Sequence, residues 1–159
     1  MKIFANATPY PIAFLAGLGA AACITVLSWL GSINGALWLM APFGATMVIL
    51  FGLPASPLAQ PRNIVLGHIL TTAVGLAIAA ACGVHPWSLG LAVGLAVTLM
   101  LVTDTTHPPA GANPLVVMLT GQDWQFLVSP VAIGTVTIVA FGLVYHRLLS
   151  RQPYPKRWF

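Results

Sequence analysis

Apolar residues fall into six long runs that polar or turn-forming residues separate. The runs cover Pro11–Gly31, Gly35–Leu53, Asn63–Cys82, Pro86–Thr103, Pro108–Thr120 and Phe126–Leu149. About 20 residues of α-helix cross the hydrocarbon layer of a membrane, so every run except the second and the fifth reads as one uninterrupted span. The pattern predicts an all-α, polytopic transmembrane helical bundle that occupies residues 1–159 as a single domain.

The second and fifth runs differ because proline interrupts them. Pro42 lies in the middle of the second run, and the fifth extends only about a dozen residues beyond Pro108, or roughly 20 Å of helix. Proline begins a helix well but breaks one in its interior. We therefore expect each run to contain a half-helix that begins at its proline and ends at about Leu53 or Thr120.

The two halves of the chain are similar at an offset of 67 residues. Pro42-Phe43-Gly44-Ala45-Thr46 aligns with Pro109-Ala110-Gly111-Ala112-Asn113, and Gly67 and Gly75 align with Gly134 and Gly142. The match indicates two pseudo-symmetric repeats, over about 11–82 and 86–149, followed by a short basic tail, 150–159. Each repeat would contain a long helix, a short or broken helix, and another long helix.

Composition and charge exclude an ordinary soluble domain. Apolar residues make up 58% of the chain and charged residues 5%, whereas soluble proteins carry roughly a quarter charged residues. Four of the six basic residues lie in the last thirteen positions, where they are typical of a cytoplasmic anchor at an anionic leaflet rather than of a nucleic-acid surface. The expected partner is thus the lipid bilayer, and the first run, which continues to Leu30 without a polar cleavage region, is expected to stay uncleaved.

Basic residues also indicate the topology. Lys2 and the basic tail put both termini in the cytoplasm of a bacterial inner-membrane protein, which requires an even number of crossings. Six crossings place Arg62 inside, whereas four crossings with two re-entrant segments place it outside. We favour six, which makes the halves an inverted repeat of the kind common among transporters.

Candidate chemistry gathers in the polar stretch from Thr103 to Asn113. Asp104 and His107 would cost several kcal/mol if they faced lipid, so they must face protein, water or a solute. A helix that begins at Pro108 has a partly positive N-terminus that can bind a small anion, and its counterpart at Pro42 has Thr46 beside it. Pseudo-symmetric halves would bring both helix starts together near the membrane midplane.

The segment Thr106-His107-Pro108-Pro109-Ala110-Gly111-Ala112 resembles the signature of the HPP family of integral membrane proteins, named after its His-Pro-Pro motif. The resemblance covers essentially the whole chain and includes Ala41-Pro42-Phe43-Gly44-Ala45 in the first half. Plant and cyanobacterial members are associated with nitrite transport. The resemblance therefore implies transport of a small inorganic anion, with nitrite as the first candidate.

Both lines of reasoning point to the two helix starts as the substrate site. The candidate substrate-binding residues are His107, Thr106, Pro108, Pro109, Ala110, Gly111, Asn113, Pro42, Gly44 and Thr46. Asp104 and His107 form a candidate proton relay, in which a proton taken up with the anion would make the transferred pair neutral. A carboxylate repels an anion unless it is protonated, paired with His107 or turned away to cap a helix. His68 is interpreted as a packing residue that bonds to a neighbouring helix.

Two other functions stay open: a small-solute channel of other selectivity, and an intramembrane enzyme that uses Asp104 and His107. We expect no catalytic site, cofactor or metal, because a metal site needs three or four convergent ligands. Gly90 and Gly94 form a small-x-x-x-small pair that is compatible with a homo-oligomer.

Overall fold

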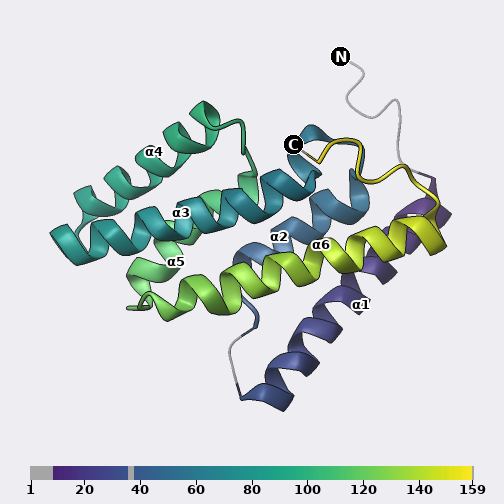
Figure 1. The fold of residues 1–159 in the computed structure, drawn as a ribbon, viewed down its shortest axis with the longest axis horizontal. Helices are drawn as coiled ribbons and strands as arrows, with labels where there is room; N and C mark the ends of the chain where they lie inside the picture. Colours follow the sequence, from purple (N-terminus) through teal and green to yellow (C-terminus); the bar gives the residue numbers. More distant parts are fainter. Residues whose placement is uncertain (1–8, 36–37, 159) are drawn as a thin grey trace.

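The computed structural model describes residues 9–35 and 38–158, and every regular element in this part of the chain is a helix (Figure 1). Lys2, on which part of the predicted topology depends, lies outside the described residues. The larger helices are α1 (Tyr10–Asn34), α2 (Ala41–Gly52), α3 (Pro61–Cys82), α4 (Pro86–Val102), α5 (Asn113–Leu119) and α6 (Ile133–Tyr145). Short helical segments are η1 (Pro57–Ala59), η2 (Pro108–Ala112), η3 (Leu127–Ala132) and η4 (His146–Ser150).

Within the described part of the chain, three helical stretches are long and apolar enough to cross a membrane. They are Tyr10–Ile33, Pro61–Cys82 and the continuous run Leu127–Ser150 formed by η3, α6 and η4. In Figure 1, α3 and α6 both lie across the molecule, with opposite chain directions, and α4 folds back along α3. Large apolar side chains such as Phe14, Val136 and Leu148 cover the outside of these helices, as lipid contact requires. The predicted all-α membrane bundle is therefore confirmed in its class.

The two short helices begin where proline predicts. Helix α2 begins at Ala41, directly before Pro42, and η2 begins at Pro108 and continues through α5 to Leu119. The residues before them, Met40 and His107, have extended backbones, so the chain enters each helix from a stretch without helical hydrogen bonds. Pro42 and Pro109, in the first turns of the two helices, are buried, so each helix begins inside the bundle.

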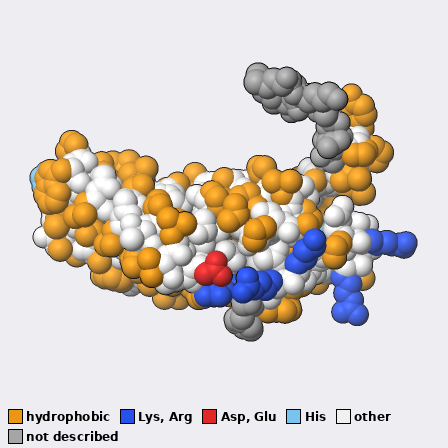
Figure 2. Space-filling view, turned by 90° about the horizontal axis from the view of Figure 1, so that it is seen from above, with side chains coloured by type: hydrophobic (Ala, Val, Ile, Leu, Met, Phe, Trp, Pro, Cys, Tyr) orange, Lys and Arg blue, Asp and Glu red, His pale blue; other side chains and the backbone are white. Residues whose placement is uncertain are grey.

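The short helices leave the interior in opposite directions. Helix α2 runs toward the end of the bundle where the α6 run finishes, because its Leu50 carbonyl oxygen lies 2.9 Å from Nε2 of His146. Helix α5 runs the other way along α3, with Pro114 and Val117 against Gly75. We call the first of these ends the basic end, because Arg62 and the tail residue Arg157 both lie there beside Asp104. Figure 2 shows Lys and Arg side chains gathered over one half of the molecule's face.

Glycines bring the long helices close to the short ones in two similar contacts. A side chain at Gly67 of α3 would meet the carbonyl of Thr105 and Cβ of Ala110, and one at Gly134 of α6 would meet the carbonyl of Trp38 and the ring of Phe43. Further along, Gly75 meets Val117, and Gly142 meets Leu50. Each member of one set lies 67 positions from its counterpart in the other, which is the offset found in the sequence.

Candidate functional site

A chain of buried polar side chains lies where the starts of α2 and η2 meet α3. It consists of Thr46 of α2, His68 and Thr72 of α3, His107 before η2, and Asn113 at the start of α5, and we call it the histidine cluster. All five side chains are fully buried. Helix α3 is roughly 33 Å long, and His68 lies roughly 9 Å along it from Arg62. The cluster therefore lies inside the bundle, about a third of the way along α3 from the end that carries Arg62.

His107 sets the direction of the hydrogen bonds. Its Nδ1 lies 2.8 Å from the Leu58 carbonyl oxygen, and its Nε2 lies 2.9 Å from Oγ1 of Thr46. A carbonyl oxygen can only accept, so Nδ1 carries the hydrogen and donates to Leu58. In a neutral imidazole the other nitrogen is then an acceptor, and the Thr46 hydroxyl donates to it.

The same logic continues through His68. Nε2 of His68 lies 2.9 Å from Oγ1 of Thr46, and because the hydroxyl hydrogen points to His107, this Nε2 must donate. Nδ1 of His68 is then an acceptor, and the side-chain nitrogen of Asn113 donates to it at 2.9 Å. Asn113 also donates to Oγ1 of Thr72 at 2.9 Å. One continuous, directed chain of hydrogen bonds thus links Asn113, His68, Thr46, His107 and Leu58.

Local sequence explains why these groups can meet. Gly67 lets α3 approach the stretch Thr105–His107, since an added Cβ would lie 2.9 Å from the Thr105 oxygen. The ring of Phe43 packs edge-on against His68 at 5.3 Å and fills the side of the cluster toward α2. Thr72 follows His68 by four residues, which places both on the same face of α3.

The helix starts offer fewer backbone donors than the sequence reasoning expected. Pro108 and Pro109 have no N–H, and the Ala110 N–H donates to the His107 carbonyl at 2.9 Å. At α2, the Phe43 N–H donates to the Met40 carbonyl at 3.0 Å. The polar groups that face the interior at this level are therefore chiefly side chains: two hydroxyls, an amide and two imidazoles.

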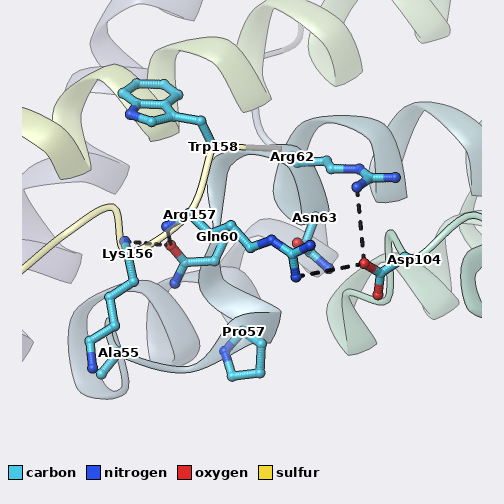
Figure 3. Close-up of a pocket in the computed structure, with 9 residues that line it drawn as sticks. All are labelled: Ala55, Pro57, Gln60, Arg62, Asn63, Asp104, Lys156, Arg157 and Trp158. Atoms are coloured by element: carbon cyan, nitrogen blue, oxygen red, sulfur yellow. Dashed lines mark hydrogen bonds and ion pairs between the residues drawn. The ribbon is translucent and has the colours of Figure 1, made fainter.

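A pocket of about 290 Å³ opens at the basic end, and we call it the basic pocket. Figure 3 shows the charged side chains around it: Arg62, Asp104, Lys156 and Arg157. Asp104 Oδ2 lies 4.0 Å from a guanidinium nitrogen of Arg62 and 4.0 Å from one of Arg157. The side-chain oxygen of Gln60 accepts from the backbone N–H groups of Lys156 and Arg157 and holds the tail beside the pocket.

The basic pocket is separated from the histidine cluster by a thin layer of protein. Asn63 lines the pocket and donates to the Thr106 carbonyl at 3.0 Å, directly before His107. Leu58, whose carbonyl binds His107, lies between the pocket residues Pro57 and Gln60. The cluster is thus closed from the pocket in this conformation, by the layer that Leu58, Asn63 and Thr106 form.

The structure brings together three of the expected substrate-binding residues, Thr46, His107 and Asn113. The other residues lie around them: Pro42, Pro109 and Ala110 are buried, Thr106 and Gly111 are half-buried, and Pro108 and Gly44 are exposed. Pro42, Pro108 and Pro109 also line an apolar groove of about 590 Å³ on the outer surface between the short helices. The helix starts therefore do meet, with the cluster on their inner side and this groove on their outer side.

Asp104 lies apart from the relay partner expected for it. Its side chain is 75% exposed and faces Arg62 and Arg157, whereas His107 binds Thr46 and Leu58. Of the alternatives for this carboxylate, the structure has it turned away from the helix start, with a left-handed backbone at φ 54°. In this conformation Asp104 and His107 therefore have different partners.

Sequence reasoning missed His68 as a site residue, although it expected a hydrogen bond to a neighbouring helix there. The available signal was its place beside Gly67, one of the repeated glycines, and four residues before Thr72 on one helix face. Among the described residues, no group of three His, Cys, Asp or Glu side chains lies together to hold a metal ion.

Comparison with known proteins agrees with the membrane character of the bundle. Residues 5–155 match the family model described as HPP, transmembrane region. Two proteins of Dictyostelium discoideum, both named only as transmembrane proteins, are 38% identical over 131 residues and 37% identical over 129 residues. These alignments cover 77% and 76% of this chain but only 42% and 45% of the relatives, so the chain spans less than half of their length. No solved structure matches the chain significantly.

Proposed function

Because this chain belongs to the HPP family of integral membrane proteins, we propose that it transports a small inorganic anion, with nitrite as the first candidate. The observation that carries the proposal is the histidine cluster, a fully buried set of hydrogen-bonding side chains between two interrupted helices and below a basic pocket. Buried polar groups at membrane depth are costly and usually mark the path of a solute.

The charge around the path favours an anion. Three cationic side chains, Arg62, Lys156 and Arg157, line the basic pocket together with one carboxylate, Asp104. The cluster below contains no carboxylate, and its hydroxyl, amide and imidazole groups can all donate hydrogen bonds to an oxyanion. Nitrite is a small planar monoanion whose hydration shell such donors can partly replace.

Six crossings of the membrane fit the arrangement of the ends. Arg62, at the start of α3, lies at the same end as the basic tail, as the six-crossing arrangement requires and the four-crossing one does not. Helix α2 rises only about 18 Å, so the chain that precedes it has to complete the second crossing of about 30 Å. With the basic end in the cytoplasm, both termini would be cytoplasmic and the protein would lie in a bacterial inner membrane.

An inverted repeat accounts for the paired glycine contacts. Chance similarity would not place Gly67 and Gly134 against partners that are themselves 67 positions apart, and Gly75 and Gly142 repeat the relation. The short helices leave the interior in opposite directions, as the two halves of an inverted repeat must. Transport would then require two openings in turn. The layer of Leu58, Asn63 and Thr106 would open the cluster to the basic pocket, and the protein on the other side of the cluster would open next.

Flux into proteoliposomes tests this function directly. We expect purified full-length protein to take up nitrite faster than protein-free liposomes, and His107→Ala to remove at least most of this excess. Thr135→Val is the matched control, because Thr135 is buried but binds only carbonyls of its own helix, at 2.7 Å from Val131 O and 3.0 Å from Ala132 O. Uptake that His107→Ala leaves unchanged would overturn the site, and preferential uptake of formate, nitrate or bicarbonate would replace nitrite as substrate.

Cysteine labelling in cells tests the topology. With Cys23 and Cys82 replaced, a cysteine at the exposed position Ala55 should react only with reagent on the cytoplasmic side, and one at Gln125 only on the other side. Labelling of Ala55→Cys from outside the cell would eliminate the six-crossing arrangement.

A further inference from the structure

The Thr46 hydroxyl has more partners than one state of the cluster can use. Its Oγ1 lies 2.9 Å from Nε2 of His68, 2.9 Å from Nε2 of His107, and 3.2 Å from the Pro42 carbonyl oxygen. In the neutral cluster this hydroxyl accepts from His68 and donates to His107. The Pro42 carbonyl oxygen is then a second acceptor to which the hydroxyl does not donate in this state.

Because the Pro42 carbonyl can accept the hydroxyl hydrogen, the cluster can take up one proton without losing a hydrogen bond. A proton transferred from hydronium to Nε2 of His107 leaves a water molecule behind and makes this nitrogen a donor. Both imidazoles then donate to Oγ1 of Thr46, whose two lone pairs accept them, and the hydroxyl hydrogen turns to Pro42. Every hydrogen bond of the cluster is kept or replaced, and only one hydroxyl rotates.

A second proton meets a different situation. It would have to occupy Nδ1 of His68, which lies 3.2 Å from Oδ1 of Asn113, and it would put two positive rings next to each other. The ring centroids of His68 and His107 are 5.0 Å apart, and like charges at that separation in a dry interior repel strongly. The cluster therefore holds one extra proton and not two.

The neighbouring elements supply no counter-charge at this depth. Helices α2, α4, η2, α5 and α6 contain no Asp, Glu, Lys or Arg, and the acid nearest in sequence, Asp104, faces Arg62 and Arg157 at the basic pocket. The other two histidines lie elsewhere: His85 stacks on Trp87 at the far end of α4, and His146 lies beside Tyr145 near the tail. A charged imidazolium in the cluster therefore needs an anion beside it.

We propose that the histidine cluster binds one proton with each transported anion, so that the protein is an electroneutral one-to-one proton–anion symporter. This inference rests on the proposed anion transport and replaces the expected Asp104–His107 relay by His107, Thr46 and His68. The anion and the proton stabilise each other because their charges cancel inside the membrane. Both are released together on the other side, which returns the cluster to its neutral hydrogen bonds.

Proteoliposomes with separately controlled pH and voltage test the coupling. Nitrite uptake and the internal pH are followed together, with the potential set by potassium and valinomycin, and protein-free liposomes are subtracted because nitrous acid crosses lipid unaided. For the wild type we expect one proton per nitrite, an initial rate that rises with an inward proton gradient, and no response to the potential. At equilibrium one pH unit then supports about tenfold accumulation.

Two outcomes would distinguish a failure of the proton coupling from a failure of the anion transport on which it rests. Protein-dependent nitrite flux that follows the membrane potential and moves no protons would contradict the proposed proton coupling but not the proposed anion transport. No flux above protein-free liposomes would remove both proposals.

A matched pair of variants locates the proton. Thr46→Val keeps the side-chain shape but removes the bridging hydroxyl, and we expect the stimulation by the proton gradient to fall to that of protein-free liposomes. Thr46→Ser restores the hydroxyl and should restore the stimulation, and Thr135→Val should leave it unchanged. Full stimulation in a folded Thr46→Val protein contradicts the assignment, and if that variant does not fold, the wild-type ratio of protons to nitrite still decides.

Discussion

The two glycine-centred contacts of this protein have the same geometry and opposite chemistry. Where α3 meets the start of η2 and α5, the interior holds His68, Thr72, His107 and Asn113. Where α6 meets α2, the positions 67 residues away hold Thr135, Val139, Met40 and Thr46. Thr135 bonds to carbonyls of its own helix, and Thr46 turns its hydroxyl to the histidines of the other contact.

The difference separates the role of the scaffold from the role of the site. A glycine that admits a neighbouring backbone is needed in both contacts, because each short helix must pack closely against a long one. Polar groups are needed in only one of them, and the other is sealed by side chains such as Phe43 and Met40. The proposed path therefore runs beside α3, and the α6 contact serves as its structural counterpart.

Removing the polar chemistry of the α3 contact should have the largest effect. His68→Leu deprives the Thr46 hydroxyl and the Asn113 amide of their partner, and buried polar groups left unpaired cost about 1–3 kcal/mol each. We expect protein-dependent nitrite flux to fall by about tenfold or more. Initial uptake rates in proteoliposomes measure the loss.

The corresponding change in the α6 contact provides the control. Thr135→Val removes a hydroxyl that binds only within its helix, so flux should stay within about twofold of the wild type. Equal losses in the two variants would break the comparison, because the polar chemistry would then not be confined to α3.

Replacing glycine by alanine in the two contacts should lower the free energy of unfolding by different amounts. An added Cβ at Gly75 would lie 2.6 Å from Cα of Pro114, which is backbone and cannot turn aside, so Gly75→Ala should lower the free energy of unfolding by about 1–3 kcal/mol. At Gly142 the neighbour is the flexible side chain of Leu50 at 3.0 Å, and Gly142→Ala should cost less than about 1 kcal/mol. Thermal unfolding in detergent compares the two, and an equal cost would show that both contacts are equally tight.

Much of this scaffold could be predicted because membrane helices and proline starts are local properties. The apolar runs gave the helix positions, and Pro42 and Pro108 lie at the beginning of α2 and η2 as expected. The glycines at the repeat offset also lie in equivalent contacts, although the sequence alone did not say what each one touches. Such patterns are readable because a single helix determines them.

The site was less predictable because its bonds join residues far apart in the chain. His107 was found through its motif, but its partners are Thr46, 61 positions away, and Leu58, 49 positions away. Pairing with His107 was one of three alternatives for Asp104. Its backbone is left-handed at φ 54°, and its carboxylate faces Arg62 at the basic pocket. Only tertiary packing decides which polar residues of neighbouring helices meet.

Adding polar chemistry to the α6 contact should sharpen the comparison. Met40→His puts an imidazole at the position that corresponds to His107, but the counterpart of His68 there is Thr135, which already binds Val131. We expect an unpaired buried ring that lowers the free energy of unfolding by about 1–2 kcal/mol and adds no nitrite flux. Met40→Leu controls for the change of shape, and a gain of flux in Met40→His would mean that α6 can also form a path.

The smallest effects should come from the basic pocket, where water screens the charges. Arg62→Gln removes a cation above the cluster, and Asp104→Asn removes the carboxylate that faces it, so the two changes should move the apparent nitrite affinity in opposite directions. We expect about a twofold to threefold loss for Arg62→Gln and a similar gain for Asp104→Asn at low salt. Both differences should fade at high ionic strength, since screening shortens the reach of exposed charges to a few ångströms. The response to the pH gradient should survive in Asp104→Asn, because the proton is assigned to the histidine cluster; its loss would move the proton site from the cluster to the basic pocket.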